Sequence, residues 1–143
     1  MSPQELLATV ETILLIDWPE RRVPETLVRA GFRVFVRGGP GPKDFSAYDL
    51  REGEVTTRPT GAPPERADLV YVYRPLTELP EIVALAQRLG AKAIWTQSGL
   101  NPDGTKAANG CWLPEAALQQ ARHFIESSGL IHVAAPYIAD SVR

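Results

Sequence analysis

The chain has 143 residues, of which 44% are hydrophobic and 22% are charged, which is the length and composition of one ordinary globular domain. This balance excludes a largely disordered chain, and no apolar run approaches the roughly 20 residues that a membrane helix needs. A formal net charge of −2 disfavours a general nucleic-acid binder, which needs a concentrated basic patch. Because the N-terminus also lacks the basic start and apolar stretch of a signal peptide, we expect a cytoplasmic protein without membrane contact.

The first part of the chain carries the pattern of strands that alternate with helices. Ser2, followed by a proline and then by Glu5, forms a capping box with proline at the first helical position. Gly31 is placed to end a second helix, because glycine readily adopts the left-handed backbone of a helix C-terminus. These signals and the apolar runs predict, in order, a helix over residues 3–10, a strand over 12–17, a helix over 24–30 and a strand over 32–36.

Residues 37–67 are rich in glycine and proline and are expected to be mostly loop. The turn over residues 38–43 reads GGPGPK, which regular structure does not accommodate. A short strand over residues 53–57 is the only regular element expected in this segment.

The alternation of strands and helices resumes after residue 67. Ile82, Val83 and Ala86 follow helical spacing, and Gly90 is placed to end that helix. The predicted elements are, in order, a strand over residues 67–73, a helix over 80–89, a strand over 93–96, a helix over 114–128 and a strand over 131–134.

This order of elements implies an α/β fold, with a single Rossmann-like, doubly wound and mostly parallel sheet covered by helices on both faces. No internal repeat or linker interrupts it, so residues 1–143 are expected to form one domain. Ligands of such sheets bind beyond the carboxyl ends of the strands. The loops that matter for function are therefore those after Asp17, Val36, Tyr73 and Thr96.

Several runs near these loops resemble the small stand-alone CoA-binding proteins. The most specific are residues 80–83 (PEIV) and 90–99 (GAKAIWTQSG), which are similar to a run that these proteins carry in a Rossmann-like domain. The resemblance covers most of residues 13–100 and implies binding of the nucleotide portion of coenzyme A. The family is related to the CoA-binding domain of succinyl-CoA synthetase-type ligases. Shorter similarities lie at residues 31–34 (GFRV), 53–55 (GEV), 68–75 (DLVYVYRP) and, toward the ligases, 38–43 (GGPGPK).

The sequence departs from this family in the loop after the first strand. Asp17 occupies the place of a family glycine, and the loop and helix up to Gly31 are shorter than usual. That glycine lets backbone N–H groups approach a pyrophosphate at a helix N-terminus, whereas a carboxylate repels an anion. Arg21 and Arg22 are placed to screen the repulsion. The segment over residues 101–112 is also longer than the family's.

The candidate ligand residues have both a functional and a structural interpretation. With CoA bound, the first loop meets the pyrophosphate, the turn after the second strand meets the adenosine end, and the loop after the central strand lines the crevice. Lys43 or Arg37 is then the partner of the 3′-phosphate. Without a ligand, the same segments are a solvated turn with Asp17 paired to an arginine, a flexible loop and a capped strand end. The predicted cofactor-binding residues are Asp17, Trp18, Arg21, Arg37, Gly38, Gly39, Lys43, Tyr73, Arg74, Pro75 and Gln97.

Other chemically versatile residues form no recognisable site. Cys111 is the only cysteine, so the chain can form neither an internal disulfide nor a cysteine-based zinc site. His123 and His132 have no companion at metal-ligand spacing and are interpreted as packed or surface residues, and Trp95 as a core residue. We therefore predict no catalytic residues, no metal and no enzymatic activity.

Three functions remain open at this point. The first is non-catalytic binding of CoA or acyl-CoA, used for sensing or for regulation of a protein partner, in a monomer or a homodimer. The second is a degenerate Rossmann-like domain that has lost CoA binding and acts as a protein-interaction module, which Asp17 and the shortened loop favour. The third is an enzyme that uses NADP rather than NAD, because Arg37 and not an acidic residue ends the second strand.

Overall fold

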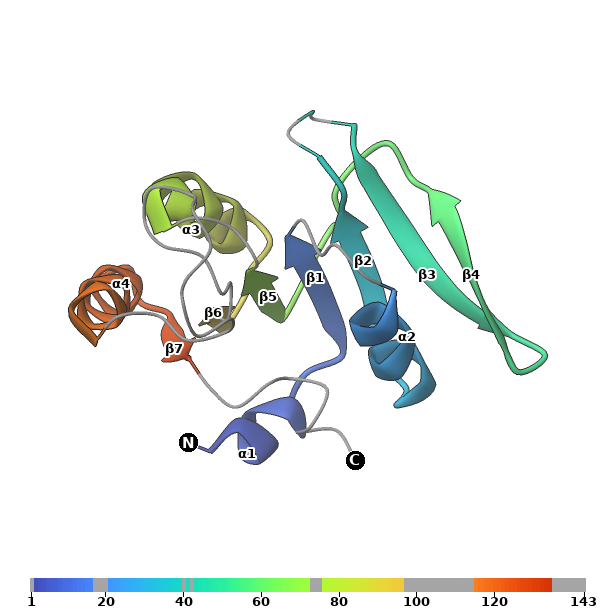
Figure 1. Cartoon of the computed structure of the whole chain (residues 1–143), viewed down its shortest axis with the longest axis horizontal. Coiled ribbons are helices and arrows are strands. Elements are labelled where there is room, and N and C mark those ends of the chain that lie inside the picture. Colours follow the sequence, from blue (N-terminus) through green and yellow to red (C-terminus); the bar gives the residue numbers. More distant parts are fainter. Residues whose placement is uncertain are drawn as a thin grey trace.

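Within the residues that the structure describes, the chain forms a seven-stranded sheet with helices on both faces (Figure 1). The computed structural model describes residues 2–16, 21–39, 41, 43–72, 76–96 and 115–134. The strands are β1 (Thr12–Ile16), β2 (Arg33–Arg37), β3 (Phe45–Arg51), β4 (Glu54–Pro59), β5 (Leu69–Val72), β6 (Ala93–Thr96) and β7 (Ile131–Val133). The helices are α1 (Pro3–Leu7), α2 (Arg22–Arg29), α3 (Leu79–Arg88), which a 3-10 turn at Leu76–Glu78 precedes, and α4 (Glu115–Ser127).

The sheet has the strand order β4-β3-β2-β1-β5-β6-β7. β1, β2, β5, β6 and β7 are parallel, whereas β3 and β4 pair in antiparallel fashion at one side. From β1 the chain first winds to β2 and later continues from β5 on the opposite side of β1, so the winding direction reverses between β1 and β5. The predicted Rossmann-like class is confirmed, and this reversal is where sheets of the class bind ligands.

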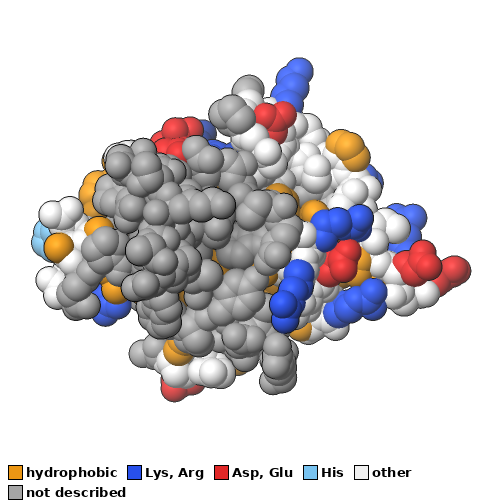
Figure 2. Space-filling view, in the orientation of Figure 1, with side chains coloured by type: hydrophobic (Ala, Val, Ile, Leu, Met, Phe, Trp, Pro, Cys, Tyr) orange, Lys and Arg blue, Asp and Glu red, His pale blue; other side chains and the backbone are white. Residues whose placement is uncertain are grey.

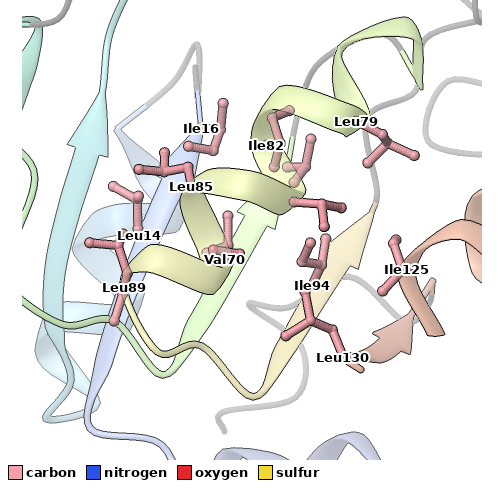
Figure 3. Packing of buried hydrophobic residues seen from close by; sticks show 14 of the residues in the cluster. Leu14, Ile16, Val70, Leu79, Ile82, Leu85, Leu89, Ile94, Ile125 and Leu130 are labelled. Carbon is pink, nitrogen blue, oxygen red and sulfur yellow. The ribbon is translucent and has the colours of Figure 1, made fainter. Parts of the chain in front are cut away.

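Two hydrophobic cores, one on each face of the sheet, follow from the two-residue period of the strands. Ile13 and Leu15 of β1 point to the face that α1 and α2 cover, while Leu14 and Ile16 point to the face that α3 and α4 cover. Figure 3 shows the second core, in which side chains of β1, β5 and β6 meet those of α3 and α4. All residues of β1 are buried, as expected for a strand read from a continuous apolar run.

The helix boundaries follow the capping signals closely. The Ser2 side-chain oxygen accepts a hydrogen bond of 3.1 Å from the backbone N–H of Glu5, although α1 ends earlier than expected. α2 begins at Arg22, before the predicted start at residue 24, and its first turn buries Val23. Gly31 has a φ of 103°, the left-handed conformation that lets the chain leave α2 and enter β2 directly.

The segment over residues 37–67, expected to be mostly loop with one short strand over residues 53–57, adds two strands to the sheet. β4 overlaps the expected strand, whereas β3 was not expected. β2 continues into β3 through a hairpin, and β3 continues into β4 through a turn. In that turn Glu52 and Gly53 have φ values of 53° and 83°, which is typical of a two-residue hairpin connection. The loop prediction is wrong over β3, where only Phe45 and Ala47 are buried, so the apolar period is too short to reveal the strand.

The described surface carries charges of both signs. In Figure 2, Lys and Arg side chains are interspersed with Asp and Glu on the right of the view, where α2, β3 and β4 lie. Among the helices formed by the described residues, none combines the length and apolar character that crossing a bilayer requires.

Candidate functional site

The carboxyl ends of four parallel strands meet along one edge of the sheet, here called the carboxyl edge. The register pairs Ile16 with both Arg37 and Val72, and pairs Val72 with Thr96. The loops predicted to bind the ligand therefore begin side by side. Of the predicted ligand residues, the structure describes Arg21, Arg37, Gly38, Gly39 and Lys43. Asp17, Trp18, Tyr73, Arg74, Pro75 and Gln97 lie outside the described residues, as do Cys111 and residues 101–112.

Arg21 lies at the N-terminus of α2, which faces the carboxyl edge because α2 directly follows β1. Its Nε lies 3.2 Å from Oε1 of Glu25, one turn further along the helix, and the Arg21 side chain is 62% exposed. Arg21 makes no side-chain capping hydrogen bond, because a guanidinium has no acceptor for the first N–H groups of the helix. An exposed guanidinium beside such N–H groups attracts anions.

Tyr48 of β3 lies within electrostatic reach of this helix end. Burial raises the pKa of Tyr48, the charge of Arg21 opposes that rise, and the charge of Glu25 adds to it. The phenol therefore stays neutral and packs against the core under α2. We conclude that Tyr48 supports the position of α2 rather than titrating near neutral pH.

The glycine-rich turn between β2 and β3 is organised around the carboxylate of Asp44. The backbone N–H of Gly41 donates to Oδ2 of Asp44 at 2.8 Å, and the backbone N–H of Gly38 donates to the Asp44 carbonyl at 2.8 Å. A Cβ atom at Gly39 or at Gly41 would lie 2.7 Å from the same Asp44 oxygen. A side chain at either glycine would therefore push aside the exposed Asp44 carboxylate, and the exposed Lys43 lies in this hydrogen-bonded turn.

A cavity of about 430 Å³ lies between this turn and α3, and we call it the hairpin pocket. It lies on the α3 face of the sheet, because Arg37 shares the strand parity of Phe35, which packs against the core of that face. One wall is α3, whose lining residues follow helical spacing, and the other includes the connection from β4 to β5. The lining residues are Arg37, Gly41, Phe45, Pro63, Glu81, Leu85, Arg88 and Leu89.

Arg37 is the most unusual residue of the hairpin pocket. Its side chain lines the pocket, and the residue is only 8% exposed. Its Nε is fully buried and has no hydrogen-bond partner among the described residues, and the ion pairs found among them are those of Arg21 and Arg58. A buried guanidinium nitrogen without an acceptor is unfavourable, and because the side chain lines the pocket, an anion there would stabilise it.

A buried hydroxyl–imidazole contact lies at the other side of the carboxyl edge. Oγ1 of Thr96 lies 2.7 Å from Nε2 of His132, and both residues are buried. Burial lowers the pKa of His132 to about 4, and the charge of Arg122 acts in the same direction. His132 is therefore a neutral packed residue, as predicted. Among the described residues, no group of three His, Cys, Asp or Glu side chains is arranged to hold a metal ion.

Trp95 is a core residue, as predicted from the sequence. It is fully buried, and its ring centroid lies 5.8 Å from that of Tyr71 on the neighbouring strand. The ring packs on the face that α1 and α2 cover, and it supports the sheet rather than forming part of the hairpin pocket.

Fold and site together define a Rossmann-like α/β protein with a ligand-sized pocket beside the carboxyl edge of its sheet. The sequence model of the CoA binding domain family matches residues 17–136. The chain therefore belongs to the CoA-binding domain family, and the resemblance inferred from residues 80–99 is confirmed.

The fold is also found in a solved structure. The crystal structure of Prb, described as the PH1109 protein redesigned for binding, matches with a TM-score of 0.58 and 19% sequence identity, covering 97% of this chain and 86% of that one. At this level of identity the likeness shows the fold alone. A search of curated proteins gave no match.

Sequence reasoning found part of this site and missed the rest. Arg37 was singled out because it ends the second strand, and the structure places it in the hairpin pocket. Phe45, Pro63 and Glu81 were missed, since only the hairpin and the packing of α3 bring them to Arg37. The sequence around Phe45 could have indicated the start of a strand, because an apolar residue directly after a glycine-rich turn often begins the returning strand of a hairpin.

Proposed function

We propose that this protein binds CoA or an acyl-CoA across the carboxyl edge of the sheet, without catalysing a reaction on it. The family match carries this proposal, because it covers the loop after β1 and the strands β2, β5 and β6, whose carboxyl ends lie along that edge. In this proposal binding serves to sense the ligand or to regulate a protein partner in the cytoplasm.

The N-terminus of α2 is the proposed contact for the pyrophosphate. Arg21 and Arg22 are exposed there, and the helix dipole adds a partial positive charge. Glu25 holds Arg21 at 3.2 Å and so restrains its guanidinium near the helix end. Trp18 and Asp17 belong to the same loop by sequence, and a ligand there requires the arginines to outweigh the Asp17 carboxylate.

The turn after β2 is the proposed contact for the adenosine end. Arg37 lines the hairpin pocket, and Lys43 projects from the turn beside it. Tyr73 and Arg74 follow β5 in sequence, and Gln97 follows β6, so in this proposal they line the crevice between the two contacts.

The proposed absence of catalysis is supported by the state of the described hydroxyl–imidazole pair. Thr96 and His132 are both buried, and a pKa of about 4 makes His132 a weak base. A general base works best with a pKa near the operating pH, so this pair is poorly suited to activate a nucleophile.

The proposal is tested by thermal unfolding with CoA, dephospho-CoA, acetyl-CoA, NAD and NADP. Ligand at about 100 times its Kd stabilises the folded state by about 2.7 kcal/mol. For a chain of this size that corresponds to a rise of several degrees in the unfolding midpoint. CoA and acetyl-CoA should raise the midpoint more than NAD or NADP, and acetyl-CoA should be recovered unchanged after incubation.

The contact at α2 is tested with the double variant Arg21→Gln/Arg22→Gln. Loss of two charged donors should weaken CoA binding by about tenfold or more. Arg51→Gln, an exposed arginine at the opposite end of β3, is the matched control and should bind as the wild type does. A wild-type protein whose midpoint responds to none of these ligands at millimolar concentration would favour the interaction module instead.

A further inference from the structure

We propose that the hairpin pocket receives a phosphate carried on a flat, largely apolar group, and that Arg37 is the residue that selects for this phosphate. The inference rests on the proposed function, in which the 3′-phosphoadenosine end of CoA supplies such a group. A free nucleotide has the same chemistry, and the experiment below separates the two sources.

The composition of the pocket fits both parts of this ligand. Phe45, Leu85 and Leu89 are buried apolar residues on its sheet and helix sides, and Pro63 adds a further apolar surface. Ligand pockets combine such apolar walls with a few polar groups that set orientation. The volume of about 430 Å³ exceeds that of a purine ring, which leaves room for a substituent.

Arg37 supplies the polar group that is still without a partner. Its Nε is buried and lacks a hydrogen-bond partner among the described residues. A guanidinium presents several donors in a planar fork, and a phosphate presents acceptors that match it. A phosphate in the pocket would therefore satisfy the donor that the protein leaves open.

The charges around the pocket favour an anion over a cation. Among the described residues that line it, Arg37 and Arg88 are positively charged and Glu81 is negatively charged, so these residues together carry a net positive charge. The Glu81 carboxylate still opposes a phosphate, because like charges repel even through partly screened space. Replacing Glu81 by glutamine should thus strengthen the binding of a phosphate-bearing ligand.

Lys43 is the competing candidate for the same phosphate, and it lies in a different environment. It is exposed at the turn, where water and salt screen its charge, and it does not line the hairpin pocket. Arg37 is buried within the pocket, so a contact to it is less screened. The selection should therefore depend on Arg37 and not on Lys43.

The test measures the affinities for CoA and dephospho-CoA by calorimetry in the wild type, Arg37→Gln and Lys43→Gln. The wild type should prefer CoA by about tenfold or more, the range expected for a charge-assisted contact. Arg37→Gln should reduce this preference to about twofold or less while leaving the affinity for dephospho-CoA nearly unchanged. Lys43→Gln, which tests the competing candidate, should keep the wild-type preference.

A CoA preference that survives in Arg37→Gln, or one that disappears in Lys43→Gln, would overturn the assignment. If Arg37→Gln does not fold, Glu81→Gln provides an independent readout, because it should increase the preference for CoA about threefold. An unchanged or smaller preference in Glu81→Gln would contradict the proposal.

Adenosine 3′,5′-bisphosphate and inorganic phosphate distinguish failure of this inference from failure of the proposed function. CoA binding that is unchanged in Arg37→Gln supports the proposed function and contradicts the assignment of the hairpin pocket. If the protein binds the bisphosphate but not CoA, and Arg37→Gln abolishes this binding, the pocket assignment is supported and the proposed function is contradicted. A wild-type protein that binds neither CoA nor the bisphosphate rejects both.

Discussion

Nε of Arg37 and Nδ1 of His132 are buried side-chain nitrogens without a hydrogen-bond partner among the described residues. The two side chains differ in how they can relieve the cost of burial. An arginine stays charged at every accessible pH, so its cost persists until an acceptor arrives. A histidine can release its proton and become neutral, so the cost of burying its charge appears only in acid. Arg37 is therefore tested by the stability of the ligand-free protein, and His132 by the pH dependence of stability.

Arg37→Met should leave the ligand-free protein as stable as the wild type or more stable, by about 1 kcal/mol. The substitution removes a buried charge and keeps most of the apolar stem, and such replacements in protein interiors are often neutral or stabilising. Urea unfolding without ligand measures this change. Arg58→Met, which removes an exposed pair with Asp49, is the control and should change stability by less than about 0.5 kcal/mol. A large loss of stability in Arg37→Met would mean that the fold itself needs the guanidinium.

His132 should make the protein less stable in mild acid. Its pKa is about 4 in the folded state, below the ordinary value of 6.5, so the unfolded chain binds a proton more readily. The free energy of unfolding should be unaffected by this group above about pH 6.5 and should fall by about 3 kcal/mol as the pH drops to about 4. Urea unfolding across this range measures the slope, and His132→Gln should flatten it. An equally steep slope in His132→Gln would assign the acid sensitivity to other groups.

Asp44 and the glycines around it make the β2–β3 turn a single packed unit. Gly39→Ala places a Cβ within 2.7 Å of the exposed Asp44 carboxylate, which must move away from the Gly41 N–H, and should destabilise the protein by about 1 kcal/mol or less. In the background of Asp44→Gly, where that carboxylate is absent, the same substitution should cost much less. A double-mutant cycle by urea unfolding measures the difference. Equal costs in the two backgrounds would show that the close approach does not determine the role of Gly39.

The strands and helices that could be predicted from the sequence are those with buried, periodic side chains. β6 was predicted with its observed bounds, because all of its residues are buried and Gly90 marks the end of the helix before it. β3 was not recognised, since only Phe45 and Ala47 of this strand are buried, and the strand expected over residues 53–57 covers only part of β4, which is mostly exposed. The turn between β3 and β4 was not predicted either, because a glutamate such as Glu52 rarely adopts the left-handed conformation that this turn requires.

The pocket is a consequence of how the whole chain is connected. The β2–β3 hairpin takes the place of a helical crossover, so the residues that face Arg37 come from α3 and from the β4–β5 connection instead. Arg37 could be predicted from its place at a strand end. Glu81 and Pro63 could not, because their proximity depends on contacts between segments far apart in the sequence. The family match covers residues 17–136 as a whole, whereas the hairpin pocket depends on the β2–β3 hairpin.

The two outer strands of the sheet, β4 and β7, determine whether copies of this protein can join edge to edge. β7 has only three residues, and β4 carries Arg58 beside Pro59, which has no N–H to donate. Short edges, charges and prolines are the features by which natural sheets avoid aggregation. We therefore expect the exposed strand β4 to disfavour fibre-like growth of the protein at high concentration.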